Sequence, residues 1–330
     1  MKTDPDFGNG RAEGTSPLWA CPRDLSPVVC PPGSGAGPRL RGVPELPEVE
    51  ALALDLAGRL NDRAIVKVHV AAFSALKTFD PPLQALEGTM VDGVARHGKF
   101  LDISASGLHL VLHLARAGWV RWRDEVPTLP PKPSNKSPLA VRVVLDDQSG
   151  LDVTEAGTRK SLAMYVVRDP ADVPGIASLG PDPLTDDFTI ELFRKILAAA
   201  GRSQIKGVLR HQGTIAGIGN AYSDEILHAA RMSPFKAASS LTDDDIHVLH
   251  DAIRVVLGDA VDRSRGLAAA ELKGEKKSHL AVHGRTGQAC PVCGDTVHEV
   301  SFADSSLQYC PTCQTGGKPL ADRRMSKLLK

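Results

Sequence analysis

The stretch Val43-Pro44-Glu45-Leu46-Pro47-Glu48-Val49-Glu50 marks the place where regular structure is predicted to begin in this chain of 330 residues. A helix should start near Pro47, because proline fits the first helical turn, where its missing N–H has no partner. Glutamates also suit the amino end of a helix, which carries the positive end of the helix dipole. Four apolar side chains then recur at helical spacing: Val49, Leu52, Leu56 and Leu60. Taken alone, the stretch predicts an ordinary helix start.

Residues 1–43, which precede this helix, are rich in Pro, Gly and Ser and show neither helical nor strand periodicity. This composition indicates a disordered or untranslated extension. The segment lacks a continuous apolar run and mixes acids with bases, which argues against a secretory signal peptide. No apolar run in the chain approaches the roughly 18 residues that a membrane span requires, so we expect a soluble cytoplasmic protein without membrane contact.

Beyond the first helix, residues 64–167 consist of short β-rich segments separated by turn residues, which predicts a sandwich or barrel. Prolines then interrupt residues 169–183, and this interruption marks a domain boundary. The following apolar spacing is helical. Thr185 is predicted to cap a helix that reaches about Ala199, residues 221–230 form another, and Thr242 opens a longer one. Residues 269–277 have the composition of a polar connector.

The carboxyl-terminal region contains two CxxC pairs, Cys290-Pro-Val-Cys293 and Cys310-Pro-Thr-Cys313, with 16 residues between them. Four thiolates at this spacing suit one tetrahedral Zn²⁺ and leave no coordination position for a catalytic water. Two disulfides or a redox-active pair are the alternatives, and a cytoplasmic location disfavours them. We therefore expect one structural zinc ion bound by these four cysteines.

Charge must be considered locally, because the 39 basic and 39 acidic residues give a net charge of zero. From Lys273 to the end, nine Lys or Arg stand against five Asp or Glu, so this end has a surplus of four positive charges. A basic terminal region is suited to face phosphates.

The opening stretch resembles the mature amino terminus of the formamidopyrimidine-DNA glycosylase and endonuclease VIII family. Further segments match the family in the same order: Gly98-Lys99-Phe100-Leu101, His113-Leu114, Leu179-Gly180-Pro181, Ile215-Ala216-Gly217-Ile218-Gly219-Asn220-Ala221-Tyr222, and Tyr309-Cys310-Pro311-Thr312-Cys313-Gln314. The resemblance covers about residues 44–314. It implies an α+β multidomain fold with a leading helix and β-sandwich, a mostly α-helical DNA-binding domain and a terminal zinc ribbon.

The composition and periodicity, together with the resemblance, divide the chain into five parts. These are an extension (1–43), an N-terminal catalytic β-sandwich domain (44–168), a helical DNA-binding domain (184–272), a zinc finger (280–314) and a basic tail (315–330). The resemblance implies a monomer that acts on damaged double-stranded DNA in the cytoplasm, in association with the nucleoid.

The implied activity is that of a glycosylase and abasic-site lyase in which Pro44, as the first residue, attacks the sugar C1′ and forms an iminium. A terminal amine, with a pKa of about 7.7–8.0, is partly unprotonated at neutral pH and so can act as a nucleophile. Glu45 would handle the proton, provided that its pKa is raised in the closed site. Lys99, on a predicted turn between strands, would bind phosphate and assist elimination.

Pro44 lies inside the chain as written, where its nitrogen is an amide without a nucleophilic lone pair. We expect translation to begin at position 43, where a GUG codon, read as Val internally, is decoded as Met at a start. Removal of that Met would leave Pro44 with a free amine.

The resemblance also assigns DNA contacts. Asn220, in a glycine-rich turn before a helix, matches a phosphate-binding Asn, and Lys206 and Arg202 match further basic contacts. Such a turn favours an anion, although a tight loop is the alternative. Glu225 matches a buried acid of the family and would otherwise be a surface carboxylate.

Three positions depart from the family enzymes that excise oxidised purines. Arg116 replaces a Met that fills the space left by the flipped base, and Arg159 falls where an aromatic wedge is expected. Ser305 replaces an Arg of the zinc hairpin, which leaves the second elimination step open. The preferred base also stays open, and a protein that binds lesions or abasic sites without excision is the alternative function.

Overall fold

The computed structural model describes residues 43–127, 129–132, 134, 137–157, 159–302 and 305–321. All of these belong to one unit, residues 40–330. The predicted extension up to residue 42 and most of the predicted basic tail, residues 322–330, lie outside the described residues. Within the described part of the chain, no helix is both long and apolar enough to cross a membrane.

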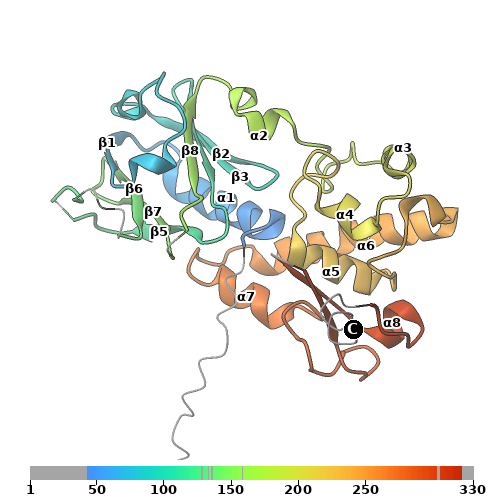
Figure 1. The fold of residues 1–330 in the computed structure, drawn as a ribbon. Helices are drawn as coiled ribbons and strands as arrows, with labels where there is room; N and C mark the ends of the chain where they lie inside the picture. Colours follow the sequence, from blue (N-terminus) through green and yellow to red (C-terminus); the bar gives the residue numbers. More distant parts are fainter. Residues whose placement is uncertain are drawn as a thin grey trace, which may run out of the picture. The chain divides into compact units, whose positions relative to one another are not determined.

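The first helix, α1 (Leu46–Leu60), begins within one residue of the predicted start and buries the four apolar residues of the predicted face. Two antiparallel four-stranded sheets follow, with strand orders β1-β6-β7-β5 and β2-β3-β4-β8 (Figure 1). Their strands are β1 (Ile65–Val70), β2 (Val91–His97), β3 (Phe100–Ala105), β4 (Leu108–His113), β5 (Gly118–Arg123), β6 (Leu139–Leu145), β7 (Gly150–Glu155) and β8 (Ala163–Val167).

One apolar core joins α1 with both sheets, for example through Leu52, Leu101 and Val153. α1 packs against β2 and β3, so this helix is part of the sandwich core. The predicted β-sandwich with a leading helix is confirmed.

The second region is helical, with a core of its own that includes Phe193, Leu209, Ile226 and Ile253. Its helices are α2 (Pro174–Ala177), α3 (Ile190–Ala200), α4 (Ile205–Arg210), α5 (Asn220–Ala229), α6 (Asp243–Ser264) and α7 (Leu272–His279). Thr242 and Asp245 form the predicted capping box of α6.

Two predictions from the sequence, a helix cap and a connector, were wrong. Thr185 does not cap α3: its hydroxyl donates to the Asp182 carbonyl within a turn, and Thr189 accepts from the Leu192 N–H instead. Residues 269–277 do not form a simple connector, because α7 occupies most of this segment. The short helix α4 was not predicted.

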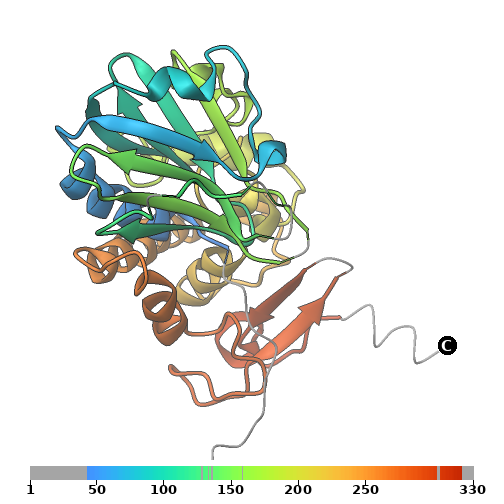
Figure 2. The same ribbon diagram turned by 90° about the vertical axis from the view of Figure 1, so that its left-hand side faces the viewer.

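The last described region contains the hairpin of β9 (His298–Ser301) and β10 (Ser306–Tyr309), seen in Figure 2, followed by α8 (Pro311–Thr315). Its small core holds Val282, Val297 and two of the four cysteines. This is the position at which the sequence predicts a zinc ribbon.

Candidate active site and metal centre

The first turn of α1 contacts the glycine-rich turn that precedes α5. The Leu46 N–H donates to the Gly217 carbonyl at 3.0 Å. Gly217 has a φ of +84°, and a Cβ at this position would lie 2.6 Å from the Leu46 Cβ. Only glycine fits both the backbone conformation and the close approach. The contact places Glu45, the residue before α1, at the amino end of α5.

The buried Glu45 carboxylate is held by the start of α5. It accepts hydrogen bonds from the N–H groups of Gly219 (2.6 Å), Ala221 (2.9 Å) and Tyr222 (3.2 Å). A Cβ at Gly219 would lie 2.3 Å from the Glu45 carboxyl carbon, so glycine is required here as well. Free N–H groups at a helix start stabilise an anion. The turn that the sequence assigned to phosphate binding therefore also binds a carboxylate of the chain itself.

Opposing influences set the pKa of Glu45. Burial raises its pKa, but two lysines and the backbone N–H donors outweigh burial and leave the pKa below its usual value. The lysines are Lys276 and Lys99. The condition set for Glu45, a raised pKa, is therefore not met in this structure, and Glu45 is a carboxylate near neutral pH.

Glu48, one turn later, is also buried and links three partners. It accepts hydrogen bonds from the Glu45 N–H (2.9 Å), the Tyr222 hydroxyl (2.7 Å) and the Lys276 ammonium (2.7 Å). Burial raises the pKa of Glu48 above its usual value, although Lys276 opposes the rise. Two carboxylates three residues apart thus have pKa values shifted in opposite directions, because only Glu45 accepts hydrogen bonds from the backbone N–H groups at the start of α5, and its charge adds to the rise in the pKa of Glu48.

Lys99 lies in the turn between β2 and β3, as predicted. Burial lowers the pKa of its ammonium below the ordinary value, against the attraction of Glu45. Burial, together with the charge of Lys99, also lowers the pKa of His113 at the end of β4. Lys99 therefore shares an electrostatic environment with Glu45. Pro44 is buried beside Glu45, and its nitrogen is acylated by Val43.

Lys206 and Asn220 belong to a polar network between α4, α5 and the hairpin. The buried Lys206 ammonium donates to the Asn220 carbonyl (3.1 Å), the Ser223 hydroxyl (2.7 Å) and the Asp224 carboxylate (2.6 Å). The Asn220 amide donates to the Ser306 carbonyl at 2.7 Å, whereas its buried Oδ1 has no partner among the described residues. Direct phosphate contact by Lys206 would require its ammonium to leave Asp224.

The other predicted DNA contacts lie on the surface. Arg116 follows β4, Arg159 follows β7, and Arg202 lies between α3 and α4, all with exposed side chains. None of the three forms an ion pair within the described ranges. The structure does not join them to the cluster around Glu45, and their roles stay predictions.

Glu225 is buried and not a surface carboxylate. Its carboxylate accepts hydrogen bonds from the N–H groups of Ala281 (2.6 Å), Val282 (3.0 Å) and His283 (2.8 Å). The neighbouring Asp224 contacts the His283 ring at 2.8 Å. α5 therefore binds the segment that leads into the cysteine-rich region.

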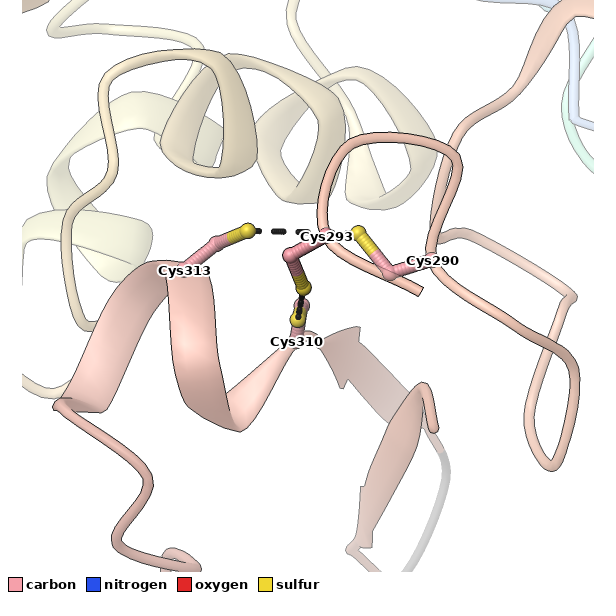
Figure 3. Close-up of side chains that lie close together, drawn as sticks. All are labelled: Cys290, Cys293, Cys310 and Cys313. Atoms are coloured by element: carbon pink, nitrogen blue, oxygen red, sulfur yellow. Dashed lines mark hydrogen bonds between the residues drawn. The ribbon is translucent and has the colours of Figure 1, made fainter. Parts of the chain in front are cut away.

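The four cysteines converge at one point, two from the loop before β9 and two from the start of α8 (Figure 3). All four sulfur atoms lie within 4.8 Å of one another, and the Cys293 and Cys310 sulfurs are 3.4 Å apart. Tetrahedral coordination with bonds of about 2.3 Å would put the sulfurs roughly 3.8 Å apart, so the arrangement suits a metal ion. All four cysteines are free, without disulfides. A His228 ring nitrogen lies 3.3 Å from the Cys290 sulfur and so contacts the thiolate set from outside.

Sequence reasoning missed three residues of the buried cluster: Glu48, Tyr222 and Lys276. Glu48 and Tyr222 fell inside quoted motifs, and their buried environment was the missing information. Lys276 carried no signal, because its segment has the polar composition of a connector. Its ammonium reaches the cluster from α7, more than 200 residues away in sequence.

Three domain families match the chain. They are the formamidopyrimidine-DNA glycosylase N-terminal domain over residues 43–164, the formamidopyrimidine-DNA glycosylase H2TH domain over residues 179–270, and the zinc finger found in FPG and IleRS over residues 287–316. The formamidopyrimidine-DNA glycosylase of Symbiobacterium thermophilum is 34% identical over 294 residues, which cover 86% of this chain and 93% of that protein. A formamidopyrimidine-DNA glycosylase-like protein of Mycobacterium tuberculosis is 60% identical over 163 residues, 48% of this chain and 99% of that protein.

Solved structures agree with these matches. Formamidopyrimidine-DNA glycosylase of Lactococcus lactis, bound to DNA that contains an abasic site, superposes with a TM-score of 0.71 at 27% identity and covers 82% of this chain and 99% of its own. The MutM (FPG) protein of Thermus thermophilus gives a TM-score of 0.70 at 31% identity, covering 84% of this chain and all of its own. The predicted family is confirmed: this chain belongs to the formamidopyrimidine-DNA glycosylase family of enzymes.

Proposed function

We propose that this chain is a DNA repair glycosylase that excises oxidised or ring-opened bases from duplex DNA and then cleaves the abasic site as a lyase. The observation that carries the proposal is the Glu45 carboxylate, adjacent to Pro44 and held by the N–H groups of Gly219, just before α5, and of Ala221 and Tyr222 in its first turn. The substrate class is supported by the name of the relatives and by the abasic DNA in a solved one.

The first step requires Pro44 to be the first residue, since an acylated nitrogen has no available lone pair. The free amine attacks C1′ of the damaged nucleotide, and the base leaves with the electron pair of its bond to C1′. The proton of the attacking amine passes to Glu45, which is ionised and able to accept it. Glu45 then gives this proton to the sugar ring oxygen as the ring opens, and an iminium remains on Pro44.

The lyase step follows from the iminium. The iminium acidifies the C2′ hydrogen. The Glu45 carboxylate, restored when the ring opens, accepts that proton, and the phosphate leaves with the electron pair of the C3′–O bond. Lys99, with its lowered pKa and its position near Glu45, is the group that we assign to phosphate binding and elimination. We assign only this first elimination, because Ser305 stands where the family has the hairpin Arg.

DNA contacts complete the proposal. Asn220 and Arg202 are assigned to phosphates, with the Asn220 side-chain NH₂, which donates to the Ser306 carbonyl in this structure, as the donor, and Lys206 joins them if it exchanges Asp224 for DNA. Arg116 and Arg159 are assigned to the space around the flipped base, since turning a nucleotide out leaves a gap in the duplex. One Zn²⁺ on the four cysteines holds the hairpin. The protein would act as a monomer on the nucleoid in the cytoplasm.

Borohydride trapping on abasic DNA tests the nucleophile. The protein is produced with Pro44 first, as verified by intact mass, and compared with P44G and with a form that keeps Val43 in front of Pro44. We expect a covalent adduct only when Pro44 is present and unblocked, and the surface variant Arg265→Ala is the matched control. If correctly processed protein binds abasic DNA but gives no adduct, it is a lesion-binding protein without excision. A panel of duplexes with oxidised purines and pyrimidines then identifies the preferred base.

A further inference from the structure

Lys276 of α7 places a buried positive charge beside the predicted nucleophile, and none of the steps proposed above uses it. Its ammonium donates to the Glu48 carboxylate at 2.7 Å and to the Val43 carbonyl at 3.2 Å. It also lies 3.9 Å from the Glu45 carboxylate and 4.7 Å from the centre of the Tyr222 ring. These contacts fix the Lys276 ammonium beside residues 43–48, the segment that contains Pro44.

The hydrogen bond to the Val43 carbonyl limits the distance between the Lys276 ammonium and the Pro44 nitrogen. Its oxygen is joined to the Pro44 nitrogen through one carbon, by bonds of about 1.23 and 1.33 Å. With the hydrogen bond of 3.2 Å, the ammonium lies within about 5.8 Å of the Pro44 nitrogen. When Pro44 is the first residue, this carbonyl is absent and the ammonium keeps its bond to Glu48. A positive charge at such a distance disfavours protonation of an amine.

The other charged groups around Lys276 include anions, which favour protonation of the Pro44 amine, and cations, which disfavour it. The titratable and charged groups that face Lys276 or share its cavity come from α1 and its cap, the β2–β3 turn, α5, α6 and α7, namely Glu45, Glu48, Lys99, Tyr222, Glu225, His228, Asp259, Arg263, Glu275 and His279. Arg210 of α4 acts on this set through Lys99. Anions favour protonation of a nearby amine, so without Lys276 the two buried carboxylates of α1 would face Pro44 with Lys99 as the remaining close lysine.

We propose that Lys276 is a positioning residue for the reaction, whose fixed charge offsets Glu45 and Glu48 and holds the freed Pro44 amine in its unprotonated, nucleophilic form. This inference rests on the proposed function. Lys276 itself does not attack the sugar, because it is engaged with Glu48 and stays an ammonium. Glu48 serves as the anchor that keeps the ammonium in place.

The test is the pH dependence of single-turnover trapping on abasic DNA, from pH 5.5 to 9.5, with the protein that begins at Pro44. In K276M we expect the midpoint of the rise in rate to move up by about 1 unit, with a roughly tenfold lower rate at pH 7 that recovers at alkaline pH. K276R keeps the charge and should keep the wild-type midpoint. E48Q/K276M removes one charge of each sign and should fall between wild type and K276M.

Three outcomes distinguish the possibilities. An unchanged midpoint in K276M, or a loss of rate by the same factor at every pH, would overturn the role of Lys276 in the protonation of the amine. No adduct from wild-type protein at any pH would instead overturn the proposed function. Thermal melts check that each variant folds. If K276M does not fold, the midpoint of E48Q/K276M is compared with that of wild type: a higher midpoint supports the role of Lys276, and an equal or lower midpoint overturns it.

Discussion

Two regions of the molecule bring distant residues together by different interactions. One is the junction between α1 and α5, and the other is the cysteine-rich hairpin. At the junction, a close glycine contact and a set of hydrogen bonds hold Glu45 and Glu48 between two helix starts. The hairpin has strands of four residues and a core of few side chains, and four thiolates converge beside it. The first is held by many shared contacts, whereas the second combines one four-thiolate centre with a small core of Val300, Leu307 and Tyr309 and a few hydrogen bonds to α5.

This difference predicts how each region fails. Small changes at the junction should alter geometry and protonation while the fold persists, because other contacts remain. A short two-stranded hairpin is marginal in water without further support, so loss of the metal should remove its structure altogether. The changes below test this contrast in order of expected effect.

The largest effect is expected from Cys310→Ser, which removes a thiolate from the metal centre. Structural zinc contributes roughly 10–16 kcal/mol in isolated zinc-finger peptides, so the hairpin should lose its order and DNA binding should fall strongly. Hydrogen exchange should show lost protection after about residue 282, with the β-sandwich unaffected, and native mass spectrometry should show the loss of one zinc ion. Val292→Ser, at an exposed position between two cysteines, is the control. A variant that keeps both metal and protection contradicts the assignment.

The next effect tests the junction. Gly219→Ala puts a Cβ 2.3 Å from the Glu45 carboxyl carbon, so Glu45 or the start of α5 must move. We expect about 1–3 kcal/mol of lost stability in denaturant unfolding and a loss of trapping rate of at least 100-fold. Gly258→Ala is the matched control, because nothing lies within 4 Å of its added Cβ and alanine favours a helix. Wild-type rates in Gly219→Ala would show that the position of Glu45 is not critical.

How much of these two regions could be predicted depends on how far apart in sequence the interacting residues lie. Periodicity and proline placement predicted α1 within a residue, and the spacing of the cysteines predicted the metal centre. Both signals are local. α7 was missed because LKGEKKSH has almost no apolar face: Leu272 is its one buried apolar residue, and Lys276 is buried through ion pairing.

The cluster itself spans distances in sequence that local patterns do not encode. Glu45 meets Gly219 from 174 residues away, and the family resemblance brought the two motifs into one site while leaving their contacts undefined. The proton-handling role predicted for Glu45 was conditional on a raised pKa in the closed site. The direction of the pKa shift depends on Lys276, Lys99 and the N–H groups of α5, which only the three-dimensional arrangement brings together.

A smaller effect distinguishes the two carboxylates of the junction. The pKa of Glu45 is lowered in the folded protein, so its contribution to stability is present above the unfolded value of about 4.3 and is lost as the pH falls through the folded value. The pKa of Glu48 is raised, so its contribution is present below about 4.3 and is lost as the pH rises through the folded value.

Urea unfolding of Glu45→Gln and Glu48→Gln, from about pH 3.5 to 6, measures the direction in which each carboxylate changes stability with pH. Relative to wild type, Glu45→Gln should lose less stability on acidification and Glu48→Gln should lose more. Subtracting the wild-type curve removes the acid sensitivity of the thiolates, which the three proteins share. Equal slopes in both variants would show that burial dominates at both positions.

The smallest effects are expected from the exposed arginines, which lie outside both regions. Arg116→Ala, Arg159→Ala and Arg202→Ala should each leave the unfolding free energy within about 0.5 kcal/mol, because none makes an ion pair among the described residues. An arginine that contacts a phosphate should lower the slope of log affinity against log salt by about 1 when it is removed. An arginine that fills the gap of a flipped nucleotide should instead weaken binding of lesion DNA more than of intact duplex. Anisotropy titrations at several salt concentrations separate these roles, with Arg265→Ala as the control, and an unchanged slope together with unchanged lesion selectivity removes that residue from the interface.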